Sequence, residues 1–199
     1  MFHNLEREPS AQPEAEDVSG GDQAEEAILE FVGDVFTCVK YVKQTKKWGE
    51  NDINGVDGVV AIEDEEGNEY LLALEASGPD AERRRKKTAQ QKREPLVYIE
   101  EEKDDNGNML VEARNGKIPR LRIGYNLNYI LALAHEAKDK GMRMAENMNK
   151  SDRRKELVKL KRNIIESFFS QIDQLRSDYE FIKAIKPLEE IFEEEMEVV

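Results

Sequence analysis

The sequence predicts an α/β fold: a small mixed sheet flanked by helices, with a long helical C-terminal extension. Two apolar runs, within 54–62 and 70–78, lie on either side of the polar turn Glu65-Glu66-Gly67-Asn68, a pattern typical of a β-hairpin. Apolar residues at helical spacing precede this hairpin and dominate the chain after residue 125. Strands near the middle of the chain with helices on both sides indicate the α/β class.

The elements around the hairpin follow from periodicity and from breaker residues. Ala24, Ile28, Phe31 and Val35 predict a helix over 23–36, and the β-rich run that follows begins a strand. The helix expected over 80–93 ends before Pro95, because the residue before a proline avoids the helical conformation. Further elements expected are a central-type strand at Leu96–Glu101, short strands at Met109–Ala113 and Leu121–Ile123, and a helix at Leu127–Lys140.

The C-terminal third carries a long apolar stripe. Its residues recur every three or four positions, from Leu157 to Ile182, and predict one long amphipathic helix, or two, before Pro187. Leu188–Val199 contains six glutamates and indicates an acidic helical tail. The stripe is interpreted either as core or as a coiled-coil-like surface for self-association, for example in a homodimer.

These patterns divide the chain into three parts. Residues 1–21 are polar and acidic and are expected to form a disordered leader. Residues 22–124 form the expected α/β core, and residues 125–199 form the helical region with its acidic tail.

Composition restricts the class of protein. The chain has 199 residues, of which 39% are hydrophobic and 37% charged, and a net charge of −13 argues against a broad nucleic-acid surface. The single cysteine, Cys38, excludes a disulfide within the chain. Neither a signal peptide nor an apolar run long enough to span a membrane is found. We therefore expect a cytoplasmic or otherwise intracellular protein without membrane association.

The hairpin carries the most informative candidate site. Asp57 begins its first strand and Glu75 lies near the end of its second. Because the start of one antiparallel strand lies beside the end of the next, both carboxylates are expected at one edge of the sheet. Hard divalent cations prefer oxygen ligands, so Asp57 and Glu75 predict a metal site, with Mg²⁺ as the expected ion.

The order of these elements resembles the core of the PD-(D/E)XK, or restriction-endonuclease-like, nuclease superfamily. The resemblance covers roughly residues 23–101: a Glu-rich helix, a strand beginning Gly-Val-Asp, a hairpin, a strand ending in an acid, a helix and another strand. It implies that Asp57 and Glu75 bind magnesium, and that Glu26 or Glu30 matches the helical glutamate of some members. The signature is degenerate, because Ser77 occupies the position of the lysine that helps to activate water.

A basic residue from the next helix is the expected replacement for that lysine. Arg84, Lys87 and Gln91 lie on successive turns of this helix, and Lys87 is taken as the catalytic candidate. The basic run 83–93 is also expected to contact phosphates, because positive charge beside a metal site is what a nuclease requires. The predicted nucleic-acid-binding residues are Arg83, Arg84, Lys87 and Gln91.

Two functions follow. The first is a nuclease-like protein that acts on nucleic acid as a Mg²⁺-dependent phosphodiesterase with a degenerate active site. The alternative is a non-catalytic interaction or assembly protein that uses the basic helix 80–93 and the long C-terminal helix. Other chemistries have no support, because two histidines and one cysteine do not form a zinc site and no phosphate-binding loop occurs.

Overall fold

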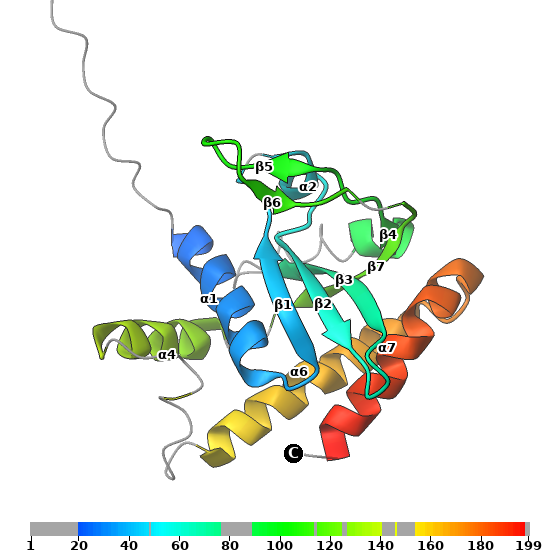
Figure 1. Cartoon of the computed structure of the whole chain (residues 1–199). Helices are drawn as coiled ribbons and strands as arrows, with labels where there is room; N and C mark the ends of the chain where they lie inside the picture. The colour runs from blue at the N-terminus through cyan, green and yellow to red at the C-terminus, as the bar shows by residue number, and fades with distance from the viewer. Residues whose placement is uncertain are drawn as a thin grey trace, which may run out of the picture.

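The computed structural model describes residues 20–47, 49–76, 89–113, 115–124, 127–140, 146 and 154–197. It confirms the α/β class, with a mixed sheet flanked by helices (Figure 1). In chain order the elements are α1 (Gly20–Val35), β1 (Val39–Gln44), α2 (Glu50–Ile53), β2 (Gly58–Glu63), β3 (Glu69–Ala76), β4 (Leu96–Val97), β5 (Glu102–Lys103), β6 (Met109–Val111), β7 (Ile118–Ile123), α4 (Leu127–Asp139), α6 (Arg154–Gln174) and α7 (Tyr179–Glu197).

Within the described ranges, five strands form the main sheet in the order β1-β2-β3-β7-β4. The predicted hairpin is confirmed: β2 and β3 pair antiparallel from Gly58↔Leu74 to Glu63↔Glu69. Gly67 closes the turn with a φ of 83°, a backbone conformation that glycine adopts without strain. β7 joins the other edge of β3 in parallel.

One predicted strand is wrong. The segment Leu96–Glu101 was expected as a central strand, but only Leu96–Val97 forms β4, and it lies at the edge of the sheet. Tyr98 is 58% exposed, which a central position would not allow. The strand that pairs in parallel with β3 is β7, which extends the short strand predicted at Leu121–Ile123 to six residues.

The two faces of the main sheet have separate apolar clusters. On one face, residues from β2, β3 and β7 pack with α1, α4, α6 and α7 in the larger core. On the other face, Val59 and Ala73 pack with Val56, Val97, Ile99 and Val111. β5, β6 and α2 lie together at one end of the molecule, away from α6 and α7 (Figure 1).

The C-terminal apolar stripe belongs to the larger core. Leu160, Ile164, Phe168 and Ile172 of α6 are buried there together with residues of the sheet. This position supports the interpretation of the stripe as core. No helix in the part of the chain that the structure describes has the length and apolar character needed to cross a bilayer.

Pro187 does not end the last helix, contrary to the sequence prediction. α7 runs from Tyr179 to Glu197, so the predicted acidic tail forms its second half. A proline inside a helix costs about 3 kcal/mol, because it removes a hydrogen bond and crowds the preceding turn. Ile185 before the proline and Leu188 and Phe192 after it are all buried, and this packing offsets the local cost.

The β2–β3 and β5–β6 connections use the same turn. Asp64 accepts hydrogen bonds from the backbone and side chain of Asn68, and Asp104 does the same with Asn108. The side-chain amide of the asparagine is the largest cause that lowers the pKa of each aspartate, supported by backbone N–H groups. The sequences Asp-Glu-Glu-Gly-Asn and Asp-Asp-Asn-Gly-Asn therefore encode one local structure twice.

We predict that Asp64→Ala and Asp104→Ala each lower the urea midpoint of unfolding modestly at neutral pH, because each change leaves several turn donors without their acceptor. Since the folded-state pKa of each aspartate is depressed, its contribution is present above the ordinary value of 3.8 and is lost as the pH falls through the folded value. The difference from wild type should therefore shrink in acid. Glu65→Ala, an exposed change in the first turn, is the control. Equal loss for Glu65→Ala would contradict this role.

Candidate functional site

Asp57 and Glu75 lie at the same end of the β2–β3 hairpin, as the sequence predicts. The backbone N–H of Asp57 donates to the carbonyl of Leu74 at 3.0 Å. Its carboxylate Oδ2 accepts the backbone N–H of Ala76, the residue after Glu75, at 2.6 Å. The first predicted acid is therefore held against the end of the strand that carries the second.

Both acids are buried, with Asp57 5% and Glu75 1% exposed. Ionised carboxylates are costly to bury unless a cation or hydrogen-bond donors compensate them. Alternation along β3 places Leu72, Leu74 and Ala76 in the larger core and Glu75 on the opposite face, with Ala73.

Gly55 lies close to the carboxylate of Glu75. A Cβ atom at this position would lie 3.4 Å from Glu75 Oε1 and 3.5 Å from Arg120 Nη1. Gly55 also has a φ of 80°, which a larger residue would adopt only under strain. The glycine therefore brings the α2–β2 loop close to a buried acid and a buried guanidinium that lie beside each other.

Arg120 is the basic residue of this cluster that the sequence analysis missed. It is fully buried, and its guanidinium donates to the carbonyl of Asn54 at 2.9 Å and to that of Glu94 at 2.7 Å. Burial lowers the pKa of Arg120, and the negative charges of Glu75 and Glu94 oppose that effect. Arg120 thus ties the α2–β2 loop to the approach to β4, directly beside Glu75.

Arg122 was also missed, and it lies on the same sheet face. The parallel register pairs Ala73 with Arg120 and Glu75 with Arg122. Leu121 and Ile123, which alternate with the arginines, belong to the larger core on the opposite face. The signal in the sequence is the period-two pattern Arg-Leu-Arg-Ile, which indicates a strand with one basic and one apolar face.

Gln91 lies inside the protein rather than at a nucleic-acid surface. It is 3% exposed, and its Nε2 donates to Gln171 Oε1 at 2.8 Å and to the carbonyl of Arg120 at 3.1 Å. A buried and bonded amide has no group to offer a phosphate at the surface. Its position therefore assigns Gln91 a structural role, and we do not retain it among the proposed nucleic-acid contacts.

The other predicted site residues divide into two groups. Glu26 and Glu30 are exposed on α1, which packs on the sheet face opposite Glu75. Ser77, Arg83, Arg84 and Lys87 lie outside the described residues. Their predicted roles are therefore untested.

Asp57 and Glu75 form a pair rather than a larger cluster. Among the described residues, no group of three or more histidine, cysteine, aspartate or glutamate side chains is arranged to hold a metal ion. A cation at this site would have only two carboxylates from the described chain, and its remaining ligands would be backbone carbonyls, water or substrate. That ligand set is the usual one for Mg²⁺.

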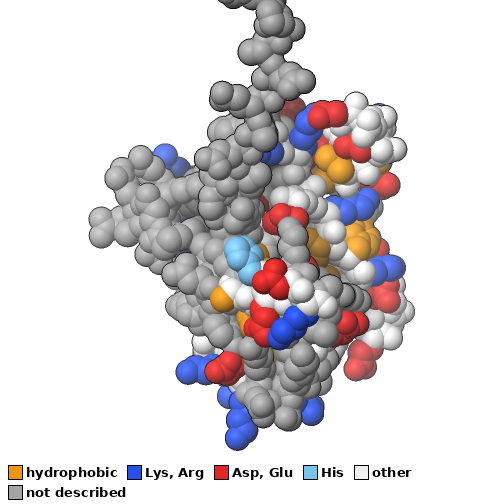
Figure 2. Space-filling model, turned by 90° about the vertical axis from the view of Figure 1, so that its left-hand side faces the viewer, with side chains coloured by type: hydrophobic (Ala, Val, Ile, Leu, Met, Phe, Trp, Pro, Cys, Tyr) orange, Lys and Arg blue, Asp and Glu red, His pale blue; other side chains and the backbone are white. Residues whose placement is uncertain are grey.

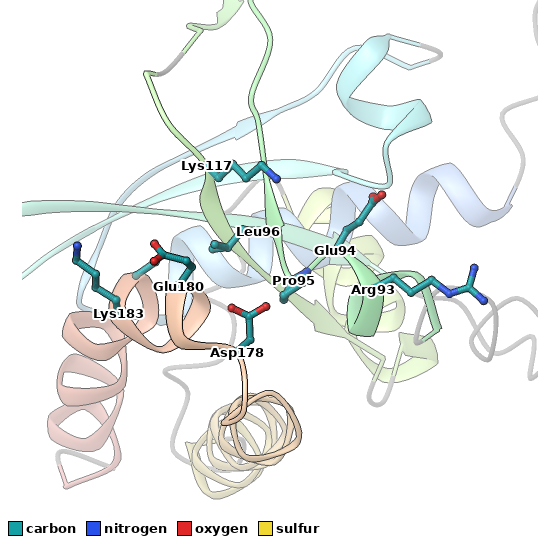
Figure 3. A pocket seen from close by; sticks show the side chains of 9 residues that line it. Arg93, Glu94, Pro95, Leu96, Lys117, Asp178, Glu180 and Lys183 are labelled. Atoms are coloured by element: carbon teal, nitrogen blue, oxygen red, sulfur yellow. The ribbon is translucent and has the colours of Figure 1, made fainter.

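A separate cavity of about 640 Å³ lies between β4 and the start of α7 (Figure 3). Pro95, Leu96 and Ala184 form its apolar part, and charges of both signs surround them. Lys117 lies on one side, Glu180 and Lys183 of α7 lie on another, and the guanidinium of Arg93 points away (Figure 3). This mixed lining favours neither an anionic nor a cationic ligand.

Surface charge is also mixed on the face shown in Figure 2. The acidic and basic side chains described there are interspersed rather than gathered into one basic patch. Broad binding to phosphates requires clustered Lys and Arg. The described part of this face therefore does not favour extended contact with nucleic acid.

No protein-family model, no curated protein and no solved structure matches this chain.

Proposed function

We propose that this chain is a restriction-endonuclease-like protein that acts on nucleic acid as a Mg²⁺-dependent phosphodiesterase inside the cell. The observation that carries the proposal is the pair Asp57 and Glu75 at one end of the hairpin, with two arginines on the adjoining strand. The order of α1 and the β2–β3 hairpin supports it, because the sequence resemblance implies a helix followed by such a hairpin.

The donor set fits a hard divalent cation. Asp57 and Glu75 lie at the same end of the hairpin and would hold it through oxygen atoms. When bound, such an ion would activate a water molecule and neutralise charge on the phosphate. Asp57, held by the N–H of Ala76, would fix one side of the site. Lys87 remains the proposed catalytic cation, and Arg83 and Arg84 the proposed phosphate contacts.

A non-catalytic interaction protein is the second candidate, and one observation favours it. Glu75 is buried beside Arg120, an arrangement that a purely structural charge pair would also produce. In that case the fold would serve a protein partner or a second copy of this chain. Metal binding separates the two candidates, because a structural pair has no need of a cation.

The test is calorimetric titration of Mn²⁺ and Mg²⁺ into wild type, Asp57→Asn and Asp139→Asn. The amide introduced by Asp57→Asn keeps an oxygen to accept the Ala76 N–H but removes a charged ligand, so we expect metal affinity to fall at least about tenfold. Asp139→Asn changes an exposed aspartate of α4 by the same chemistry and should leave affinity unchanged. Metal binding by wild type would justify cleavage assays on DNA and RNA.

Two results would count against the enzyme. Wild type without detectable binding at millimolar metal would leave Asp57 and Glu75 as structural acids. Equal weakening in Asp57→Asn and Asp139→Asn would show that the cations bind diffusely to an acidic surface.

A further inference from the structure

We infer that Arg122 of β7 supplies a positive charge beside Glu75 and binds the substrate phosphate there. This inference rests on the proposed function and refines it. It adds a positive charge on the neighbouring strand of the sheet to the one proposed at Lys87.

Register places Arg122 beside Glu75. The two residues are paired in the parallel β3–β7 ladder, and neighbouring strands lie about 4.8 Å apart. Leu121 and Ile123 take the opposite face, so the Arg122 side chain leaves the sheet on the same face as Glu75.

Burial distinguishes Arg122 from Arg120. Arg120 is enclosed, and both terminal nitrogens of its guanidinium donate to main-chain carbonyls. Arg122 is only half-buried, so part of the residue is accessible to solvent. A planar guanidinium presents paired donors that match two phosphate oxygens. Arg120 thus positions the cluster, and Arg122 is suited to contact an incoming substrate.

The main chain of Arg122 is fixed by a side chain from α6. Its N–H donates to Gln171 Oε1 at 2.9 Å, and Gln171 Nε2 donates to its carbonyl at 2.8 Å. β4 pairs with β7 only at Ile118 and Pro119. At Arg122, the two bonds to Gln171 hold the backbone of β7 in place. A guanidinium carried by a fixed backbone needs less reorganisation to bind an anion.

The charges favour phosphate only after metal has bound. Among the described residues, Arg120 and Arg122 balance the charges of Asp57 and Glu75, so without metal these four residues have little net charge to attract a phosphodiester. A divalent cation leaves the same cluster positive. Arg122 should therefore weaken metal binding slightly by repulsion and strengthen phosphate binding to the loaded site.

These opposite signs define the experiment. Mn²⁺ affinity is measured by calorimetry, and access of a phosphodiester by the phosphorus NMR line broadening of dimethyl phosphate in the presence of Mn²⁺-loaded protein. We expect Arg122→Gln to bind Mn²⁺ about threefold to tenfold more tightly and to broaden the signal about tenfold less at equal metal loading. Arg122→Lys, which keeps the charge, should restore wild-type Mn²⁺ affinity and part of the broadening. Arg162→Gln, an exposed change on α6, should match wild type in both.

A merely structural arginine would give a different result, because loss of local structure weakens both readouts together. Parallel losses in Arg122→Gln, or no change relative to Arg162→Gln, would overturn the role of Arg122 while leaving a metal site at Asp57 and Glu75. Absence of Mn²⁺ binding in wild type would instead refute the proposed function, and the inference with it.

Discussion

Lys161→Met should lower the free energy of unfolding by about 3–5 kcal/mol, because it leaves Glu195 buried without its cation. Lys161 of α6 and Glu195 of α7 form an ion pair, and both side chains are buried. Glu195 also accepts hydrogen bonds from the backbone N–H and the hydroxyl of Thr37, at 2.8 Å and 2.7 Å. The pair joins both C-terminal helices to the turn before β1.

The pH dependence of this pair has a defined sign. Burial raises the pKa of Glu195, but hydrogen bonds from Lys161 and Thr37 outweigh it and hold the pKa below its ordinary value of 4.5. In wild type, the contribution of Glu195 is therefore present above 4.5 and is lost as the pH falls through the folded value. In Lys161→Met the dominant compensating donor is gone, so burial should raise the pKa instead. The variant should then gain stability relative to wild type as the pH falls toward 4.5.

Urea unfolding of four proteins checks both statements. Lys159→Met removes an exposed lysine of α6 and should lie within about 0.5 kcal/mol of wild type. The double variant Lys161→Met with Glu195→Leu should recover most of the loss, because replacing both partners of a buried pair is often nearly neutral. A single Lys161→Met that is no less stable than Lys159→Met would contradict the assignment.

Cys38 lies against this pair and should be a poor nucleophile. Burial is the main cause that raises the pKa of its thiol to about 12, and the charge of Glu195 adds to the effect. The sequence alone does not predict how reactive this cysteine is, because the pKa of its thiol depends on neighbours that are remote in the chain.

The hairpin was predictable because its determinants are local. The turn residues Gly67 and Asn68 and the apolar runs on both sides specify β2, β3 and their register within a short segment. That register places Asp57 and Glu75 at one end of the strands, so the candidate acids also follow from the sequence. Their burial does not, because it depends on segments that pack over them from elsewhere in the chain.

The arginines were not predictable, because pairing between β3 and β7 is non-local. Nearly fifty residues separate Glu75 from Arg122, and nothing in either segment specifies the partner strand. The apolar run at Leu96–Ile99 has the composition of a buried strand, which explains why a central strand was predicted there. The alternation of Arg120 and Arg122 with buried residues predicts a strand with a basic face, but it does not predict which residues lie against that face.

Gln171→Leu is expected to have the second large effect, about 2–4 kcal/mol of stability, because it removes an amide that serves several buried partners. Gln171 accepts from the N–H of Arg122 and from Gln91 Nε2, and it donates to the Arg122 carbonyl. Leucine fills the space but satisfies none of these groups, and each polar group left buried without a partner costs about 1–3 kcal/mol. The predicted loss of stability is smaller than the sum of the costs of the individual polar groups, because Arg122 is only half-buried and water can reach part of it.

Gln174→Leu is the matched control, since the same change on an exposed position of α6 removes no buried partner. Urea unfolding of the two variants and wild type gives the comparison, and equal stability of Gln171→Leu and Gln174→Leu would show that the amide bridge is dispensable. Because Gln171 fixes the backbone of Arg122, its loss should also weaken the broadening of dimethyl phosphate by Mn²⁺-loaded protein. Metal affinity should change less than phosphate binding, since Asp57 and Glu75 are held by the hairpin itself and not by α6.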